Sequence, residues 1–252
     1  MLEVNGLSKR FGGFTAVNAV SFQVGRGEIL GLIGPNGSGK STIFNMLSGT
    51  LAPDAGSIRF DGAEIAGMAP HRIIQRGVGR TFQIPRPFRR LSLRDNVVLA
   101  AFYGAGAGSR AAAEAAADRA LDLVGLPTNA GGRVDGLGAA GLKKLELAKA
   151  IATAPKLLLA DESLGGLDEH EMEQSADMLQ RIRTELGITI IWVEHIMGVL
   201  MRVVDRVLVL DHGEVIAEGL PADVVRDSRV IEVYLGSDEV VTHAAATGAA
   251  TA

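Results

Sequence analysis

The stretch Gly34-Pro35-Asn36-Gly37-Ser38-Gly39-Lys40-Ser41, followed by Thr42, decides the fold. It satisfies the pattern G-x-x-x-x-G-K-[S/T], in which a glycine-rich turn points backbone N–H groups at phosphate oxygens. The apolar run Ile29–Ile33 precedes it, and a helical pattern over residues 42–47 follows it. A strand, a loop and a helix in this order are the context that the pattern needs, because the helix adds its positive N-terminal end. The stretch therefore predicts a phosphate-binding loop in an α/β fold.

Lys40 and Ser41 give this loop its expected chemistry. The Lys40 ammonium group would neutralise charge on the β- and γ-phosphates of a nucleotide, and the Ser41 hydroxyl would ligate Mg²⁺. A glycine-rich turn can match the pattern by chance, but the strand and helix on either side favour a phosphate site. By itself the loop predicts nucleotide binding and no more specific function.

A second element supplies acidic groups. The apolar run at residues 157–160 reads as a strand, and it ends in Asp161-Glu162. Carboxylates at the C-terminal end of such a strand lie beside a ligand bound at the same edge of the sheet. Asp161 would hold the metal, through water or directly, and Glu162 would polarise the attacking water. An isolated Asp-Glu pair is more typical of a solvated helix start, but beside Lys40 and Ser41 the catalytic interpretation is favoured.

Composition narrows the function classes. The 252 residues suit one α/β domain, with or without an inserted subdomain, and 47% apolar residues exclude disorder for most of the length. A net charge of −4 gives no basic footprint for nucleic acid. Cysteine is absent, which excludes disulfides and thiolate metal sites and fits a reducing compartment. Apolar runs are shorter than the roughly 18–20 residues of a membrane span, and the N-terminus lacks a signal-peptide pattern. We expect a cytosolic chain that reaches a membrane only through partners.

The strand pattern predicts a largely parallel, covered sheet in an α/β fold. Short apolar runs alternate with helical patterns, and we expect strands near residues 2–4, 20–24, 29–33, 57–60, 77–82, 157–160, 188–193, 207–210 and 215–218. The earliest and last strands could be antiparallel additions, since short turns separate some of them. From 85 to 154 the strand signal disappears, and an alanine-rich helical pattern covers 110–124. We predict one domain over 1–236, with a catalytic core (1–84 and 155–236), an inserted helical subdomain (85–154) and a flexible tail (237–252).

The order of these elements resembles the ATP-binding subunits of ABC transporters, over about residues 2–236. In that family a phosphate loop, a glutamine, a signature that opens a helix, an acidic strand, a D-loop and a switch histidine follow one another. The matching positions here are Gly34–Thr42, Gln83, Leu137-Gly138-Ala139-Ala140-Gly141, residues 157–162, residues 165–168 and His195. The resemblance implies a P-loop NTPase fold with N-terminal antiparallel strands and an inserted helical subdomain. It also implies ATP and Mg²⁺ as ligands, and ATP hydrolysis as the activity.

The resemblance assigns roles to several residues outside the phosphate loop. Gln83 would contact the metal or water and report the γ-phosphate to a transmembrane partner, and His195 would hold the γ-phosphate. Asp168 would touch the opposite subunit's site, and Phe11 would stack on adenine. Without the resemblance, Gln83 would be a polar residue at a strand end, His195 a structural histidine and Phe11 a core phenylalanine. The implied set is, for catalysis, Glu162, His195, Gln83 and Lys40; for nucleotide, Phe11, Gly34, Pro35, Asn36, Gly37, Ser38, Gly39, Lys40, Ser41, Thr42, Gln83, Gly138, Ala139, Ala140, Asp168 and His195; for metal, Ser41, Gln83 and Asp161.

The signature departs from the family pattern. The family's run is Leu-Ser-Gly-Gly-Gln, so the serine that would bind the other subunit's γ-phosphate is replaced by Gly138. The methyl groups of Ala139 and Ala140 also narrow the space through which the backbone of this segment would approach that phosphate. Losing one charge-assisted hydrogen bond costs about 1.5–3 kcal/mol in that contact. We therefore expect an asymmetric pair of sites. The site built on Lys40 and Glu162 would be completed by a partner's intact signature, and the reciprocal site would be slower.

Other segments resemble the ATPases of branched-chain amino-acid uptake systems. These segments are Arg80-Thr81-Phe82-Gln83, residues 91–97, residues 193–195, residues 205–213 and residues 230–236. Such systems pair two different ATPase chains with two transmembrane permease subunits and an external solute-binding protein, and this chain is similar to the first ATPase. The resemblance implies a heterodimer, with a homodimer left open, at the inner face of the cell membrane.

Three alternatives stay open at this point. ABC proteins of DNA repair or translation are ATPases without transport, but they usually carry two cassettes or a long coiled-coil insertion. The altered signature is also compatible with a regulatory module that holds nucleotide with little turnover. An importer for urea, amides, aromatic acids or other amino acids would have the same kind of ATPase, because the cargo does not touch this subunit.

Overall fold

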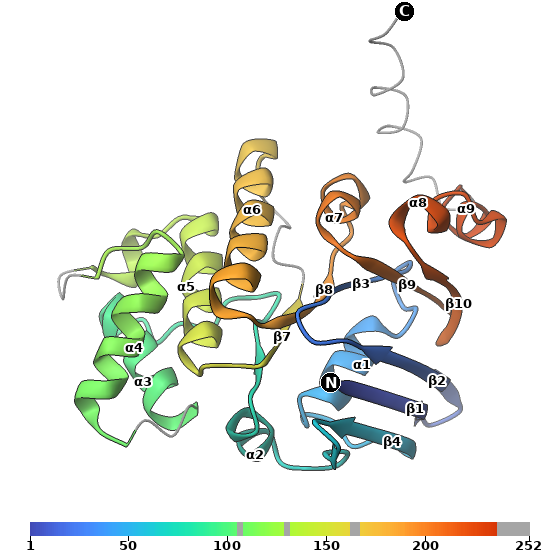
Figure 1. Ribbon diagram of the computed structural model, residues 1–252, viewed down its shortest axis with the longest axis horizontal. Helices are drawn as coiled ribbons and strands as arrows, with labels where there is room; N and C mark the ends of the chain where they lie inside the picture. Colours follow the sequence, from blue (N-terminus) through green and yellow to red (C-terminus); the bar gives the residue numbers. More distant parts are fainter. Residues whose placement is uncertain (105–107, 129–131, 162–166, 236–252) are drawn as a thin grey trace, which may run out of the picture.

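Two β-sheets organise the chain (Figure 1). The computed structural model describes residues 1–104, 108–128, 132–161 and 167–235. A four-stranded sheet has the order β2-β1-β4-β5 and a six-stranded sheet the order β10-β9-β3-β8-β7-β6. The strands are β1 (Leu2–Phe11), β2 (Phe14–Val24), β3 (Ile29–Ile33), β4 (Ala55–Phe60), β5 (Ala63–Glu64), β6 (Val78–Arg80), β7 (Leu157–Asp161), β8 (Thr189–Val193), β9 (Arg206–Asp211) and β10 (Glu214–Gly219).

The larger sheet is parallel apart from its last strand, as the sequence predicted. Strands β6, β7, β8, β3 and β9 pair in parallel, and β10 pairs antiparallel with β9 through a short turn. Every residue of β3, β7 and β8 is buried. Strands covered on both faces are continuous apolar runs rather than alternating ones, which is why the sequence revealed them clearly.

The smaller sheet differs from the expectation in strand length. All its strands pair antiparallel, but β1 and β2 extend as a long hairpin well beyond the predicted segments 2–4 and 20–24. Register shifts interrupt their pairing, and several side chains of the extension are exposed. A twisted, partly exposed ribbon with bulges has no continuous apolar run, so the search for apolar runs missed it. Conversely, β6 is shorter than the predicted 77–82.

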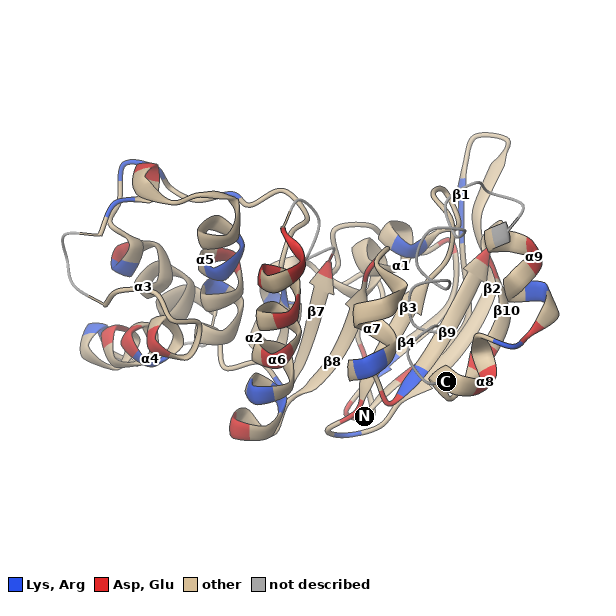
Figure 2. Cartoon of the chain, turned by 90° about the horizontal axis from the view of Figure 1, so that it is seen from above, with Lys and Arg blue, Asp and Glu red and all other residues tan. Residues whose placement is uncertain are grey.

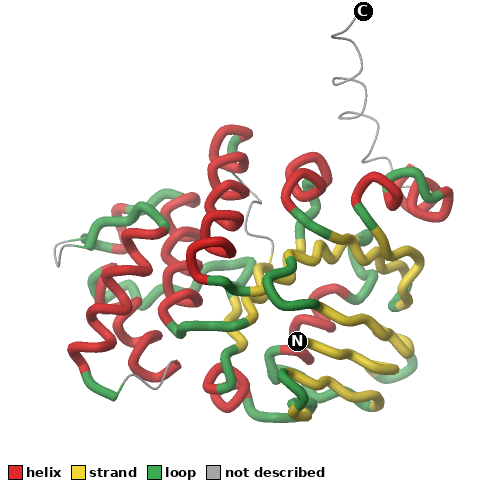
Figure 3. Tube along the Cα trace, viewed as in Figure 1, coloured by secondary structure: helices red, strands yellow, loops and turns green. Residues whose placement is uncertain are grey.

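Helices cover the larger sheet and extend to one side of it (Figures 1 and 3). They are α1 (Lys40–Leu47), α2 (Pro70–Gln75), α3 (Leu93–Gly104), α4 (Arg110–Leu123), the 3₁₀ turn η1 (Val134–Gly136), α5 (Ala139–Ala152), α6 (Glu169–Leu186), α7 (Met197–Val203), α8 (Pro221–Val224) and α9 (Ser228–Leu235). The alanine-rich run forms α4, as predicted, with Ser109 as its N-cap. Its buried alanines allow close packing with α3 and α5. None of the helices described here is long and apolar enough to cross a membrane.

The two faces of the parallel sheet pack against different partners. Ile29 and Ile33 of β3 belong to a core shared with the helices α3 to α7, whereas Leu30 and Leu32 belong to a core shared with α1 and the antiparallel sheet. This division follows from the alternation of side chains along a strand. Helix α1 therefore lies between the two sheets. Charges are spread over the outer helices, with acidic side chains at the start of α6 and arginines near its end (Figure 2), as the helix dipole favours.

Candidate phosphate-binding site

The glycine-rich stretch forms the loop between β3 and α1, as the sequence predicted. Gly34 and Gly39 have φ angles of 152° and 106°. A Cβ atom added at Gly34 would lie 2.1 Å from the Leu210 carbonyl oxygen, and one added at Gly39 would lie 2.6 Å from the Ala16 carbonyl oxygen. Only glycine fits either position, because both the conformation and the space exclude a side chain. The loop is thus wedged between β2 and the end of β9.

Lys40 holds the loop from inside. Its side chain is buried, and its ammonium group donates hydrogen bonds to the carbonyl oxygens of Gly34 (2.7 Å) and Pro35 (2.9 Å). The Ser38 hydroxyl is buried and has no hydrogen-bond partner among the described residues. A curled loop with a buried ammonium group and an unsatisfied hydroxyl, at the start of a helix, suits a phosphate group. The residues present therefore fit the phosphates of a nucleotide.

The turn between β9 and β10 supports the loop from the side. The Gly213 N–H donates to the Ser38 carbonyl oxygen (3.1 Å), and the Gly213 carbonyl accepts from the Asn18 N–H (2.8 Å). These bonds connect the turn to the loop on one side and to β2 on the other. The loop is therefore attached to both sheets, which limits the positions that its N–H groups can take.

Strand register places the acidic strand end at the same edge as the loop. Leu32 of β3 and Asp161 of β7 are both register partners of Val193, which lies on β8 between them. Strands β3 and β7 are two strand spacings apart, so Leu32 and Asp161 lie about 9–10 Å from each other. The phosphate loop begins at Gly34, two residues after Leu32. Parallel topology thus brings the loop and the Asp161 carboxylate together, as predicted from their positions after strands.

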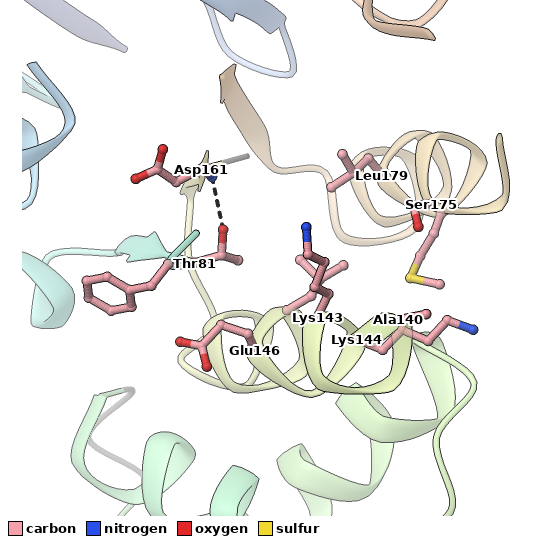
Figure 4. Close-up of a pocket in the computed structure, with 11 residues that line it drawn as sticks. Thr81, Ala140, Lys143, Lys144, Glu146, Asp161, Ser175 and Leu179 are labelled. Carbon is pink, nitrogen blue, oxygen red and sulfur yellow. Dashed lines mark hydrogen bonds between the residues drawn. The ribbon is translucent and has the colours of Figure 1, made fainter. Parts of the chain in front are cut away.

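Asp161 is buried and held by its neighbours. Its backbone N–H donates to the Thr81 hydroxyl (3.0 Å; Figure 4), and its carboxylate accepts from the Arg80 guanidinium at 2.9 Å. Side-chain alternation explains its direction: Leu157 and Leu159 of the same strand face α1, so Asp161 faces α1 as well. Glu162, the predicted water-polarising residue, lies outside the described residues.

Arg80 is the residue of the site whose role the sequence did not reveal. It ends β6, and its guanidinium group donates hydrogen bonds to Asp161, to Asn45 of α1 and to Ser48, the C-cap residue of α1. The pair with Asp161 joins positions 81 apart in the chain, so no local pattern could show it. One general signal was available. A charged side chain is rarely buried unless it is paired, and Asp161 ends the strand next to that of Arg80.

Two further predicted residues follow strands of the parallel sheet at the same edge. Gln83 is exposed in the segment after β6, and His195 is exposed directly after β8, where its N–H donates to the Glu194 carboxylate (3.2 Å). Phe11 ends β1 with 50% of its surface exposed, and it pairs with Phe14 across the hairpin. A half-exposed aromatic face suits stacking on a planar ring. The roles of Gln83, His195 and Phe11 stay predictions.

The altered signature forms the start of α5. Gly138 is the N-cap residue, with no side-chain hydrogen bond to the helix, and a Cβ atom added there meets nothing within 4 Å. Ala139 and Ala140 form the first turn. The segment therefore presents backbone N–H groups at a helix start without the hydroxyl of the family's serine. Whether it meets another subunit's nucleotide stays a prediction.

Asp168 has a structural role that the sequence interpretation overlooked. Its carboxylate accepts from the Glu171 N–H (2.8 Å), and the Glu171 carboxylate accepts from the Asp168 N–H (3.1 Å), which makes a capping box at the start of α6. The pattern Asp-x-x-Glu before a helix is a local signal for this cap. The predicted contact of Asp168 with another subunit is compatible with the cap and stays a prediction.

A small cavity of about 30 Å³ lies between Asp161 and helices α5 and α6 (Figure 4). Lys143 of α5 points into it, and Thr81 and Glu146 line it. Glu146 is buried and accepts hydrogen bonds from Lys149 (2.8 Å) and from the Arg86 N–H (3.3 Å). The bond from the Arg86 N–H attaches the segment after Gln83 to α5. Asp161 at the strand end and helix α5 of the helical region therefore line the same cavity.

Comparison with known proteins agrees with this geometry. Residues 17–165 match the family model for ABC transporters, and residues 214–240 match a model for branched-chain amino acid ATP-binding cassette transporters. The high-affinity branched-chain amino acid transport ATP-binding protein BraF of Pseudomonas aeruginosa is 35% identical over 249 residues, which cover 94% of this chain and 98% of that protein.

Solved structures show the same architecture. The ADP conformation of an ATP-binding cassette of an ABC transporter superposes with a TM-score of 0.84 at 27% identity, covering 94% of this chain and 98% of that one. A dimeric cassette in a post-hydrolysis state, bound to ADP and phosphate, gives a TM-score of 0.77 at 25% identity, covering 88% and 99%. The match extends over the helical region as well as the sheets. This chain belongs to the ABC transporter family, as one of its ATP-binding cassettes, which are ATPases that work with a partner ATPase and membrane permease subunits.

Proposed function

We propose that this chain hydrolyses Mg·ATP to drive an importer for branched-chain amino acids. The observation that carries the proposal is the shared register of Leu32, Val193 and Asp161, which brings the phosphate loop and the acidic strand end to one edge of the sheet. The cargo class is supported by the identity to BraF over nearly the whole chain and by the second family match at the C-terminus.

The proposed reaction is ATP + H₂O → ADP + phosphate. Backbone N–H groups of residues 34–42 bind the phosphate oxygens, and Lys40 neutralises charge on the β- and γ-phosphates. Ser41 and Asp161, with Gln83, are the residues that would hold Mg²⁺, which when bound neutralises charge on the phosphate oxygens. Glu162 orients and polarises the attacking water. The buried setting of Lys40 and Asp161 strengthens these charge interactions because water is largely excluded there.

Around this centre, Phe11 stacks on the adenine ring, and His195 contacts the γ-phosphate and responds to its loss. Gln83 reports the presence of the γ-phosphate to the permease. Its exposed position after β6, in a segment that Glu146 attaches to α5, suits a contact between nucleotide and partner. These roles come from the family resemblance. The positions of Gln83 after β6 and of His195 after β8, and the half-exposed ring of Phe11, support them.

We further propose that two ATPase subunits close head-to-tail over two nucleotides. Gly138, Ala139 and Ala140 then face the partner's phosphates from the start of α5, and Asp168 lies near the subunit boundary. Because the segment offers N–H groups and no hydroxyl, the site that it completes is the slower one. A heterodimer in which the partner supplies an intact signature fits this asymmetry. Two permeases place the pair at the inner face of the membrane, and an external binding protein delivers the cargo.

The test is phosphate release by the purified chain, alone and with its partner ATPase and permeases in proteoliposomes. Release that needs Mg²⁺ and nearly stops in Glu162→Gln, while that variant still binds ATP, is the expected result. A Glu162→Gln variant with the wild-type rate would remove this residue from its role. Protein that binds no ATP would overturn the site itself.

The cargo is tested separately in the same vesicles. We expect ATP-driven accumulation of radiolabelled leucine, isoleucine and valine with the wild-type chain, and none with Lys40→Ala. Accumulation of urea, amides or aromatic acids in place of these amino acids would keep the ATPase and replace the substrate class. ATP binding with no turnover in the full assembly would instead favour a regulatory subunit, to which the altered signature also points.

A further inference from the structure

Arg80 ends β6 with its side chain on the α1 side of the sheet. Val78, two residues earlier on the same strand, belongs to the core beneath α1, so strand alternation sends Arg80 to the same side. Asp161 at the end of β7 faces that side for the same reason. The two side chains therefore meet on the α1 face, next to the helix that begins with Lys40 and Ser41.

The Arg80 guanidinium joins this helix to the acidic strand. Its Nη2 donates to Asp161 Oδ2 at 2.9 Å, and its Nη1 donates to Asn45 Oδ1 and to the Ser48 hydroxyl, each at 2.8 Å. Asn45 and Ser48 lie at the far end of α1 from Ser41. The rigid, planar guanidinium of an arginine holds two partners in one fixed geometry, whereas a lysine offers a point charge on a flexible stem.

Arg80 is buried among aromatic rings. Its side chain is 10% exposed and that of Asp161 is 7% exposed. The guanidinium lies 5.9 Å from the centre of the Phe44 ring and 5.0 Å from that of Phe82. The rings hold the guanidinium plane between α1 and the segment that leads to Gln83.

Stability alone does not account for this arrangement. A buried ion pair often stabilises a fold no more than apolar residues of the same volume would, because both charges lose their hydration. Here the Arg80 Nε is also buried without a hydrogen-bond partner among the described residues, which adds to the cost. The geometry has another consequence. It fixes the distance between α1, which carries Ser41, and the carboxylate of Asp161.

We propose that Arg80 is a positioning residue for the metal site: it bridges α1 and Asp161 so that the Ser41 hydroxyl and the Asp161 carboxylate are held at the separation that Mg²⁺ requires. Magnesium demands a nearly ideal octahedral arrangement with short bonds, and tolerates displaced ligands poorly. Residues that orient metal ligands in this way affect affinity without touching the ion. The inference rests on the proposed Mg·ATP site.

The experiment measures how much Mg²⁺ the purified full-length chain needs to bind a ribose-labelled fluorescent ATP analogue. Each variant is titrated with the analogue in EDTA and then with MgCl₂ at fixed analogue. For Arg80→Met we expect the half-saturating Mg²⁺ concentration to rise about tenfold, the lower end of the effect of removing a residue that orients metal ligands. Binding in EDTA should stay within about twofold of wild type, because the loop and Lys40 are untouched.

Two further variants separate the bridge from the charge. Arg80→Lys keeps a cation beside Asp161 but loses the contacts with Asn45 and Ser48 at the end of α1. The Mg²⁺ concentration that this variant requires should therefore rise, by less than in Arg80→Met. Asn45→Ala keeps the ion pair and removes one contact on α1, so it should shift the requirement in the same direction by less. Both variants carry the test if Arg80→Met does not fold.

The matched control is Arg206→Met. Arg206 is a partly buried arginine at the start of β9, paired with Glu28 at 2.8 Å and bonded to Glu218 and the Gln23 carbonyl, at the opposite edge of the sheet. It should lower thermal stability and leave the Mg²⁺ requirement unchanged.

The outcomes decide between the possibilities. An unchanged Mg²⁺ requirement in Arg80→Met overturns the inference. A lower requirement also overturns it, since Arg80 would then act as a cation competing with Mg²⁺. A wild-type Mg²⁺ requirement in Arg80→Lys or in Asn45→Ala would mean that a positive charge beside Asp161 is sufficient. Either result would overturn the role of the bridge to α1. Wild-type protein that binds no analogue, or binds it without Mg²⁺ dependence, would instead contradict the proposed site itself.

Discussion

Gly34 lies directly against the carbonyl oxygen of Leu210, so close that a Cβ atom at this position would be 2.1 Å from it. This contact joins the first residue of the phosphate loop to the end of β9. It shows that the glycine is required by the packing of the loop on the sheet, in addition to its backbone conformation. The phosphate loop is therefore shaped by strands that follow it far along the chain.

Gly34→Ala should accordingly disrupt the loop. Forcing a methyl group into this contact costs about 1–3 kcal/mol of unfolding free energy, and the displaced loop should lose binding of the labelled ATP analogue. Chemical denaturation and the binding titration measure the two effects. Gly198→Ala in α7, where an added Cβ meets nothing within 4 Å, is the control: it should leave nucleotide binding unchanged and should not lower stability, because alanine favours a helix more than glycine does. Full nucleotide binding by Gly34→Ala would contradict the assigned packing.

Asp168→Ala should destabilise the chain by about 1 kcal/mol, because it removes the N-cap of α6 and leaves the Glu171 N–H without its acceptor. Asp168→Asn keeps an acceptor and should retain most of the stability. Urea unfolding of the three proteins tests this. If Asp168→Asn is stable yet lowers ATPase activity in the assembled transporter, the predicted contact with the partner subunit is supported. Equal stability of all three proteins would remove the capping role.

The parts of the fold that the sequence predicted are those in which one local pattern is sufficient. Strands such as β3 and β7 are buried on both faces and are therefore uninterrupted apolar runs. The phosphate loop is a contiguous pattern that includes its own strand and helix. The β1–β2 hairpin was underestimated, because its outer half is a bulged, partly exposed ribbon without such a run.

The positions of several candidate site residues in the fold were predictable for the same reason. Lys40, Ser41 and Asp161 stand in motifs that can be recognised along the chain, and the structure places them at one edge of the sheet. The role of Arg80 could not be predicted, since it depends on contacts with α1 and with a strand 81 positions away. The capping box at Asp168 was visible in the sequence but was passed over in favour of the role that the family suggested.

Gly138→Ser should stabilise the start of α5 by a few tenths of a kcal/mol, since serine is a slightly better N-cap than glycine. The open space around Gly138 admits the side chain. In the assembled transporter, ATPase activity should rise or stay unchanged, because the hydroxyl restores a phosphate contact in the slower site. Gly136→Ser, at another open position in the preceding turn, is the control. A severe loss of activity in Gly138→Ser would count against the asymmetric pair.

The helical region should contribute a pH-dependent term to stability through Arg94 and Asp118. Arg94 of α3 donates to both carboxylate oxygens of Asp118 in α4, at 2.6 and 2.9 Å, and this bond holds the pKa of Asp118 below its ordinary value of 3.8. A carboxylate with a lowered pKa stabilises the fold above its unfolded pKa, and the stabilisation is lost as the pH falls through the folded pKa.

Asp118→Asn should therefore lower the melting temperature at neutral pH, and the gap to wild type should narrow as the pH falls below 3.8. The control is Asp122→Asn, an exposed carboxylate on the same helix. Circular-dichroism melts over a series of pH values give the gap directly. A gap that stays constant down to the lowest pH would show that the ionised carboxylate of Asp118 contributes nothing.

The central claim is tested most directly by a crystal structure of Glu162→Gln with Mg·ATP bound. The account predicts that the triphosphate lies in the loop of residues 34–42 with Lys40 against its β- and γ-phosphates, and that Mg²⁺ lies between the Ser41 hydroxyl and Asp161. A nucleotide bound elsewhere on the chain, or Asp161 remote from the metal, would contradict it.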